Sequence, residues 1–285
     1  MNISELRLQY HARLCSRVIC LSSGSDGKNL PNFADEDSDL SRHLAWGILD
    51  KIGCKGSYSA AKNQSAEEQF KIITKEFLEK TFSLLSHVRP GEWIYTCEQP
   101  AIFQFTQYAH LAYIEKVFKS DPSLESAFGG NYIVRPDIVI SRNPASDQTL
   151  NHDGLLSDMD ETHARLTPLR MHNQSDPILH AVISCKWTTR NDRAQNTRTE
   201  VLNLIRNRKG NLPHVVAITA EPFPSRISAL ALGTGDLDCV YHFALHELLA
   251  SAKELNNEES LEILNMMVQG RRLRDISDLP FDLAI

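Results

Sequence analysis

Two apolar runs in the middle of the chain, residues 132–141 and 179–188, constrain its fold most strongly. Their length and their β-branched residues predict two strands buried inside a sheet. Helical segments and further strands alternate after them. This order predicts an α/β fold with one central mixed sheet flanked by helices. No internal repeat or flexible linker marks a boundary, so residues 1–285 are expected to form a single domain.

The other expected elements follow from hydrophobic spacing and turn residues. The longest is a helix at 65–87, where Phe70, Ile73 and Phe77 recur near helical spacing and Ser65 could cap the first turn. Further helices are expected at 3–18, 38–52, 100–119, 193–208 and 224–231, and two more at 244–269. Further strands are expected at 92–98, 214–219 and 238–243. Long loops are expected at 22–37 and 142–176, the second with a short helix.

Composition indicates a soluble cytoplasmic protein with one basic segment. No run approaches the roughly 18 apolar residues of a membrane-spanning helix, and the N-terminus lacks a secretory pattern. The six cysteines never fall as C-x-x-C, so reduced thiols are expected and a zinc site is not. The net charge of −6 argues only weakly against a nucleic-acid partner, because it is an average over the whole chain. Residues 186–209 hold seven Lys and Arg against two acids, as a surface facing phosphates would.

Candidate catalytic residues lie on the two apolar runs. Asp137 follows Pro136 in the first run, and alternation places Ser184 and Lys186 on one face of the second. Phosphodiester hydrolysis needs an activated water and positive charge around the transition state, and Mg²⁺ held by carboxylates supplies both. Singly, Asp137 is more often a turn residue and Lys186 an exposed strand end. Together they predict a site in which Asp137 and the Cys185 carbonyl bind the metal and Lys186 orients or deprotonates a water.

One carboxylate is too few for such a metal site, and serine stands at position 184, where a second acid is expected. Glu200, in the expected helix 193–208, is a candidate replacement, because it could reach back toward the end of the strand. A solvated helix position paired with Arg193 is the simpler interpretation of Glu200. The spacing alone leaves both open.

The segment after Lys186 carries residues suited to reading base pairs. Arginine binds guanine O6 and N7 through two hydrogen bonds, and aspartate accepts one from cytosine N4. Arg190, Asp192 and Arg193 at a helix start could present both to adjacent G·C pairs in the major groove. The alternative is an ordinary charged first turn, with Asp192 favoured by the helix dipole.

Three features together resemble a known group of nucleases. They are Ser-Cys-Lys-Trp at 184–187, Arg-x-Asp-Arg-Ala-Gln-Asn at 190–196 and the distant Glu200. They resemble the type II restriction endonucleases of the PD-(D/E)xK superfamily that cut around CCGG cores, most closely the NgoMIV-like, GCCGGC-specific family. Similar stretches cover almost the whole chain and include residues 87–91, 107–111, 207–214, 224–228, 231–235 and 275–280.

The resemblance implies a restriction-endonuclease-like core in which the second acid has moved from the strand to the following helix. The implied catalytic residues are Asp137, Ser184, Lys186 and Glu200, and the implied metal ligands are Asp137, Cys185 and Glu200. The residues implied to read the inner CCGG are Arg190, Asp192 and Arg193, and those implied to read the outer G·C pair are Asp35 and Gln64.

The resemblance also implies a cofactor, a product and an assembly. The cofactor is Mg²⁺, for which Mn²⁺ could substitute. The substrate is double-stranded DNA containing GCCGGC, cut after the first G to leave four-base 5′ overhangs with 5′-phosphates. A homotetramer (a dimer of dimers) is implied, together with a cognate cytosine methyltransferase that protects the host genome without being a physical partner.

Lys71 departs from the family pattern, in which a glutamate follows the phenylalanine of the long helix as a further active-site acid. An ammonium group cannot ligate Mg²⁺ and would repel it. Glu67 or Glu68 could compensate, Lys71 could supply the charge of a second metal, or the protein could bind GCCGGC without cutting it. A structure-specific junction nuclease of the same superfamily is a further alternative. Such enzymes read backbone shape, so the residues suited to G·C pairs argue against it.

Overall fold

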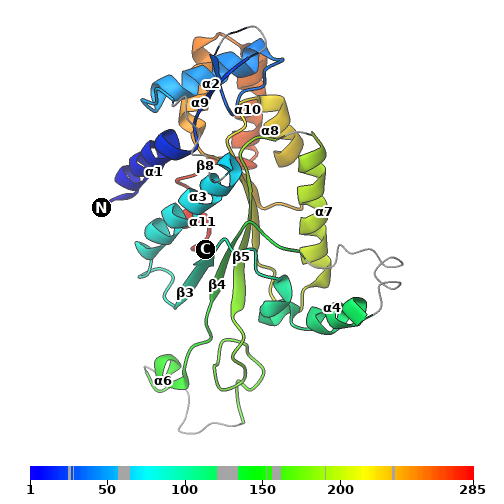
Figure 1. The fold of residues 1–285 in the computed structure, drawn as a ribbon. Coiled ribbons are helices and arrows are strands. Elements are labelled where there is room, and N and C mark those ends of the chain that lie inside the picture. The colour runs from blue at the N-terminus through cyan, green and yellow to red at the C-terminus, as the bar shows by residue number, and fades with distance from the viewer. Residues whose placement is uncertain are drawn as a thin grey trace.

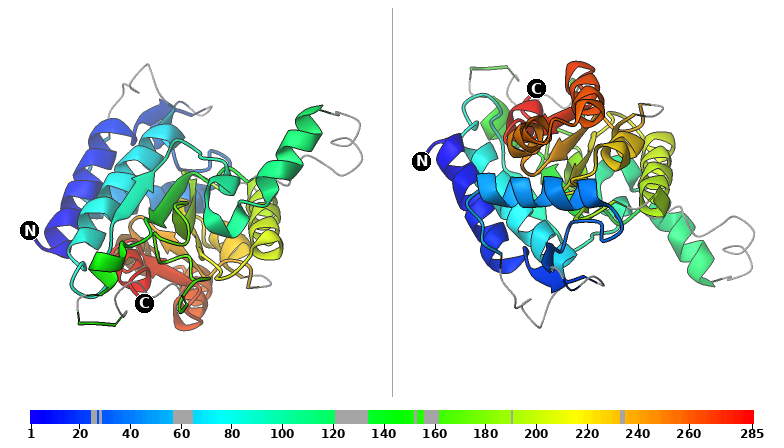
Figure 2. Two further views of the ribbon diagram at one scale, coloured as in Figure 1. Left: turned by 90° about the horizontal axis from the view of Figure 1, so that it is seen from below. Right: turned by 90° about the horizontal axis from the view of Figure 1, so that it is seen from above.

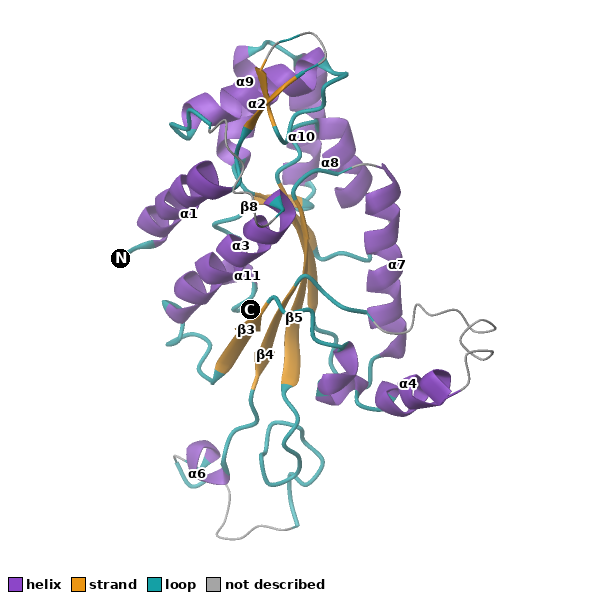
Figure 3. Cartoon of the chain, viewed as in Figure 1, coloured by secondary structure: helices purple, strands orange, loops and turns teal. Residues whose placement is uncertain are grey.

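The computed structural model describes residues 1–24, 27, 29–56, 65–120, 134–151, 153–155, 162–189, 191–232 and 235–285, without the side chains of Lys119 and of residues 191–197 (Figure 1). A six-stranded mixed sheet forms its centre, in the order β3-β4-β5-β6-β7-β8 (Figure 3). Its strands are β3 (Trp93–Thr96), β4 (Ile138–Arg142), β5 (Ile178–Lys186), β6 (His214–Thr219), β7 (Cys239–His242) and β8 (Leu273–Asp275). Pairing is antiparallel from β3 to β5 and parallel from β5 to β8. The predicted α/β fold with a central mixed sheet is confirmed.

Helices flank this sheet. The described helices are α1 (Ile3–Arg17), α2 (Asp39–Lys51), α3 (Ala66–Ser83), α4 (Leu111–Ser120), α6 (Asp147–Leu150), α7 (Asn191–Asn207), α8 (Pro224–Ala231), α9 (Leu245–Glu254), α10 (Glu258–Gln269) and α11 (Leu279–Asp282). Of these, α4 and α6 project away from the sheet (Figure 1). Helices α1 and α3 lie on one side of the sheet and α7 on the other (Figure 2). The site described below therefore has a helix on each side.

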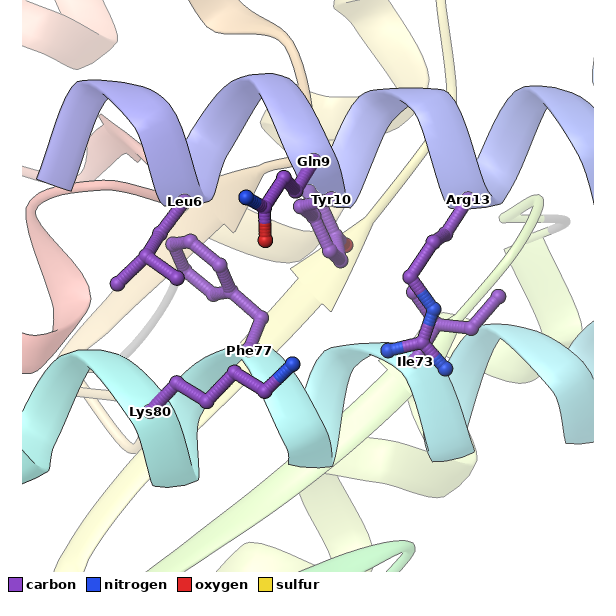
Figure 4. Close-up of a pocket in the computed structure, with 7 residues that line it drawn as sticks. All are labelled: Leu6, Gln9, Tyr10, Arg13, Ile73, Phe77 and Lys80. Atoms are coloured by element: carbon purple, nitrogen blue, oxygen red, sulfur yellow. The ribbon is translucent and has the colours of Figure 1, made fainter. Parts of the chain in front are cut away.

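Helix α3 begins where the sequence predicts, because the side chain of Ser65 accepts a hydrogen bond from the main-chain N–H of Glu68. It packs against α1, with the rings of Tyr10 and Phe77 4.9 Å apart and the Tyr10 hydroxyl 3.0 Å from that of Thr74. The cavity left between the two helices is only about 20 Å³. Figure 4 shows its lining residues, Leu6, Gln9, Tyr10, Arg13, Ile73, Phe77 and Lys80. This close packing fixes α3, and with it Lys71, against the sheet.

Trp187, just beyond β5, anchors the core on the α3 side. Its ring lies 5.1 Å from Phe70, 5.5 Å from Phe33 and 5.9 Å from Phe243. Because side chains alternate along a strand, Ser184 then faces the other side, toward α7. Burial of four aromatic rings is a large hydrophobic contribution, and it holds the end of β5 in place.

The structure differs from the sequence-based expectation in several elements. The helix expected at 100–119 is two 3₁₀ turns, η1 (Ile102–Gln104) and η2 (Thr106–Tyr108), followed by α4. Phe105 interrupts it with extended dihedral angles, φ −104° and ψ 143°, because Thr106 N–H donates to the carbonyl of Pro177. The strand predicted at 132–141 corresponds to β4, which starts only at Ile138. The strands β1 (Leu21–Ser23) and β2 (Asn29–Pro31), together with β8 and α11, were not predicted.

A disulfide joins Cys15 and Cys54, so the expectation of reduced thiols is wrong for these two residues. The first lies in α1 and the second follows α2, and 39 positions separate them in the sequence. Only the folded arrangement brings them together. Cys20, Cys97, Cys185 and Cys239 are free thiols. None of the described helices combines the length and apolar character that crossing a membrane requires.

Candidate active site

The pairing of β4 with β5 brings Asp137 and Lys186 together. The strands run antiparallel, with Ile138 opposite Ile183, so the residue before β4 meets the end of β5. Asp137 Oδ2 accepts a hydrogen bond of 2.9 Å from the main-chain N–H of Cys185 and lies 3.4 Å from Lys186 Nζ. The carboxylate is therefore fixed by the backbone of the same strand that carries the lysine.

Ser184 and Glu200 line one small cavity with Asp137. Its volume is about 20 Å³, enough for one water molecule. The Ser184 hydroxyl is buried and has no hydrogen-bond partner among the described residues, which is unusual for a buried polar atom. A water in the cavity would give this hydroxyl a partner. The structure thus brings together all four residues of the predicted catalytic set.

Glu200 comes from α7, on the side of the sheet that Ser184 faces. Loss of hydration raises the pKa of the Glu200 carboxyl, and the charge of Lys186 acts in the opposite direction. The negative charge of Asp137 adds to the rise in the pKa of Glu200, as expected for two carboxyl groups that line one cavity. The alternative prediction, an ion pair between Glu200 and Arg193, involves a side chain outside the described residues.

Lys71 reaches the same carboxylate from α3. Its Nζ lies 3.8 Å from Asp137 Oδ1 and 2.8 Å from Glu68 Oε2, and its side chain is 8% exposed. Burial lowers the pKa of Lys71, but the hydrogen bond to Glu68 and the charge of Asp137 outweigh this and raise the pKa above its usual value. Lys71 is thus a charged ammonium group. Each oxygen of Asp137 has a lysine beside it.

Glu221, just beyond β6, is a further residue at this edge of the sheet. Its carboxylate accepts hydrogen bonds from the main-chain N–H groups of Thr189 (2.9 Å) and Phe223 (3.2 Å). Burial raises the pKa of Glu221 to about 7, against the lowering effect of these bonds and of Arg226. Glu221 therefore holds the turn between Lys186 and α7. Glu221 was not among the predicted site residues, although a charged residue at the end of an apolar run, the signal by which Lys186 was predicted, also marks it.

The residues expected to contact bases are only partly described. Arg190 and Gln64 lie outside the described residues, and Asp192 and Arg193 occupy the first turn of α7 without described side chains. Asp35 is described, and it forms an ion pair with Arg226, which in turn lies 3.9 Å from Glu221. The base-reading roles of all five residues stay predictions.

Among the described residues, no group of three or more His, Cys, Asp and Glu side chains is placed to hold a metal ion. The carboxylates available are Asp137 and Glu200. The two carboxylates and the Ser184 hydroxyl supply oxygen ligands, which Mg²⁺ prefers, but the cavity they line is otherwise apolar and has room for one water, not for a hydrated ion. The ammonium group of Lys71 does not fit a second cation beside Asp137 Oδ1.

Comparison with known proteins covers nearly the whole chain. A sequence profile of the NgoMIV restriction enzyme family matches residues 10–285. The type II restriction enzyme NgoMIV of Neisseria gonorrhoeae is 44% identical over 286 residues, which cover 99% of this chain and 98% of that protein. Among solved structures, the complex of restriction endonuclease PspGI with substrate DNA matches with a TM-score of 0.26 and 13% identity, over 99% of this chain and 92% of that one. That structural likeness is too weak to support a conclusion, whereas the sequence matches include every residue of the site.

Proposed function

Because the chain belongs to the NgoMIV restriction enzyme family, and so is a type II site-specific endonuclease, we propose that it cuts double-stranded DNA at GCCGGC with Mg²⁺ as cofactor. The proposed cut follows the first G and leaves four-base 5′ overhangs with 5′-phosphates. Mn²⁺ is proposed to substitute for Mg²⁺. The observation that supports the reaction is the meeting of Asp137 and Lys186 at the ends of adjacent strands, with Glu200 in the same cavity.

In this proposal, Asp137 and Glu200 hold the cation together with the main-chain carbonyl of Cys185. The cation supplies positive charge for the transition state and lowers the pKa of a water molecule. The Cys185 N–H orients the Asp137 carboxylate, since it binds Oδ2 at 2.9 Å. Lys186, 3.4 Å from the same oxygen, is placed to orient the attacking water or take its proton. Ser184 adds a hydroxyl that can bind water in the cavity.

The proposed recognition of the inner CCGG uses Arg190, Asp192 and Arg193, at the turn that Glu221 holds in place. Asp35 and Gln64 are proposed to read the outer G·C pair. Asp35 would have to exchange its ion pair with Arg226 for a contact with cytosine. Such an exchange would discriminate between bases, because the lost ion pair is replaced by a hydrogen bond only when the correct base is present.

The proposed active form is a homotetramer of single-domain chains, acting in the bacterial cytoplasm. A cognate cytosine methyltransferase in the host would protect GCCGGC sites, because an unprotected genome would be cut. Sedimentation of the free protein tests the tetramer directly. A monomer at micromolar concentration would contradict it.

Cleavage of paired plasmids tests the function. A plasmid with one or more GCCGGC sites should be linearised or fragmented in Mg²⁺, and a matched plasmid without the site should stay intact. Asp137→Ala should abolish cutting, whereas Asp50→Ala, at an exposed position of α2, should not. Equal cutting of both plasmids, or activity in Asp137→Ala, would overturn the proposal.

A second candidate function is favoured by one observation, the charged Lys71 beside Asp137. The protein would then bind GCCGGC without cutting it. This alternative expects a site-specific gel shift in Ca²⁺, no cleavage in Mg²⁺ or Mn²⁺, and restored cleavage in Lys71→Glu. Cleavage by the unmodified protein excludes it.

A further inference from the structure

A second cavity lies at the opposite end of β5 from Asp137 and Lys186. Its volume is about 390 Å³, within the range of roughly 300 to 1,000 Å³ that small-molecule sites occupy. Its walls come from the start of β5, from β3, from the segment before β6 and from residues 167–169 of the long insertion. None of the proposed catalytic or base-reading residues lines it. The cavity is therefore separate from the site described above.

Two arginines line this cavity, and no acidic side chain does. Arg142 lies over the ring of Trp93, 5.7 Å from its centroid. Arg89 donates from Nη1 to the carbonyl of Ile285 (3.2 Å), and its Nε is buried without a partner in the described part of the chain. Neither guanidinium group has a carboxylate side chain at ion-pair distance among the described residues. The cavity wall therefore carries two positive charges and no acidic side chain among its described lining residues.

The two guanidinium groups are partly buried, and their like charges repel each other. An anion bound between them would remove this repulsion. Here burial, followed by the charge of Arg89, lowers the pKa of Arg142. Other polar groups in the wall are already engaged. The Gln107 amide binds both main-chain groups of Leu179, and His180 Nε2 lies 2.8 Å from the carbonyl of Leu283. An anion is the partner that these walls lack.

We propose that this cavity binds a small ligand through an oxyanion, a phosphate or phosphomonoester group held by Arg89 and Arg142. The planar fork of arginine matches such groups through paired hydrogen bonds. The volume accommodates more than a bare phosphate, so both inorganic phosphate and a 5′-nucleotide are chemically consistent sources. The proposal does not depend on the proposed DNA cleavage, since it concerns the other end of the sheet.

Isothermal titration of the full chain at low salt tests the site, with inorganic phosphate and adenosine 5′-monophosphate as separate probes. We expect saturable binding with one site per chain, and the probe with the higher affinity identifies the source. Arg142→Gln should weaken binding about tenfold or more, as loss of a charge-assisted contact does. Arg17→Gln, an exposed arginine in the last turn of α1, is the matched control and should bind as the parent does.

Leu169→Trp is a second variant that fills the cavity from the insertion side without changing any charge. It should abolish binding, whereas Arg142→Gln is expected to weaken it, and it tests the proposal if Arg142→Gln fails to fold. Melting temperatures of all variants establish that they are folded. Absence of saturable binding by both probes would overturn the proposal, and so would binding that neither Arg142→Gln nor Leu169→Trp weakens.

Discussion

Replacing Lys71 with glutamine removes a positive charge beside Asp137 and keeps a side chain that can still bond Glu68. The ammonium group lies 3.8 Å from Asp137 Oδ1 and is almost fully buried. Two unit charges at that distance interact by roughly 4 kcal/mol at an effective dielectric constant of about 20, and by roughly 1 kcal/mol in water. A divalent cation on Asp137 would be repelled by Lys71 to a similar extent. Lys71→Gln should therefore tighten cation binding by roughly fivefold to a thousandfold.

Calorimetric titration of Ca²⁺ into the complex of the protein with a GCCGGC duplex measures this change without depending on cleavage. Lys75→Gln is the matched control, because Lys75 lies one turn further along α3 and pairs with Glu79 at 2.9 Å. An unchanged Ca²⁺ affinity in Lys71→Gln would refute the electrostatic reasoning. Cleavage in Mg²⁺ then separates the two candidate functions. If Lys71→Gln cuts faster than the parent, Lys71 impairs catalysis. If Lys71→Gln cuts more slowly although it binds the cation more tightly, the charge of Lys71 assists catalysis.

Three further predictions concern stability. Glu221→Gln should flatten the pH dependence of unfolding: the pKa of Glu221 is raised to about 7, so the stability it contributes is complete below pH 4.5 and is lost as pH rises through 7. The loss reaches roughly 3 kcal/mol. If denaturant unfolding at a series of pH values gives parent and variant the same pH dependence of the free energy of unfolding, the prediction is wrong. Ser184→Ala should leave the free energy of unfolding unchanged or raise it by up to about 1 kcal/mol, because the hydroxyl has no partner, while slowing cleavage. A clear loss of stability in that variant would mean that the hydroxyl is bonded. Reducing the Cys15–Cys54 disulfide should lower the free energy of unfolding by at most about 4 kcal/mol through loss of a chain constraint. Cys15→Ser should then melt identically with and without reductant, and a parent insensitive to reductant would contradict this.

Strongly patterned elements could be predicted from the sequence with little error. The strand at 214–219 and the helix at 224–231 have the predicted bounds, because apolar runs and a proline at a helix start act locally. The segment 100–119 could not be predicted as well. Its 3₁₀ turns depend on a hydrogen bond from Thr106 to Pro177, far along the chain. In this segment a tertiary contact overrides the local helix propensity.

The residues of the candidate site were likewise predictable only in part. Asp137 and Lys186 could be found because each is a charged residue in an apolar run, and antiparallel pairing of the two strands brings the start of one beside the end of the other. Glu200 was only a candidate, since spacing alone could not separate a ligand from a solvated helix position. Its place in one cavity with Asp137 and Ser184 comes from the packing of α7 on the sheet.

The sequence by itself determined the alternation of strands and helices, the acid and the lysine at the strand ends, and the family. Each of these properties depends on a short stretch of the sequence. The tertiary structure alone decided which charges face one another. It placed Lys71 of α3 against Asp137, linked Cys15 to Cys54, and left Arg89 and Arg142 in one cavity without an acid. Electrostatic interactions depend on distance through space, and residues far apart in the sequence acquire such distances only when helices pack on the sheet.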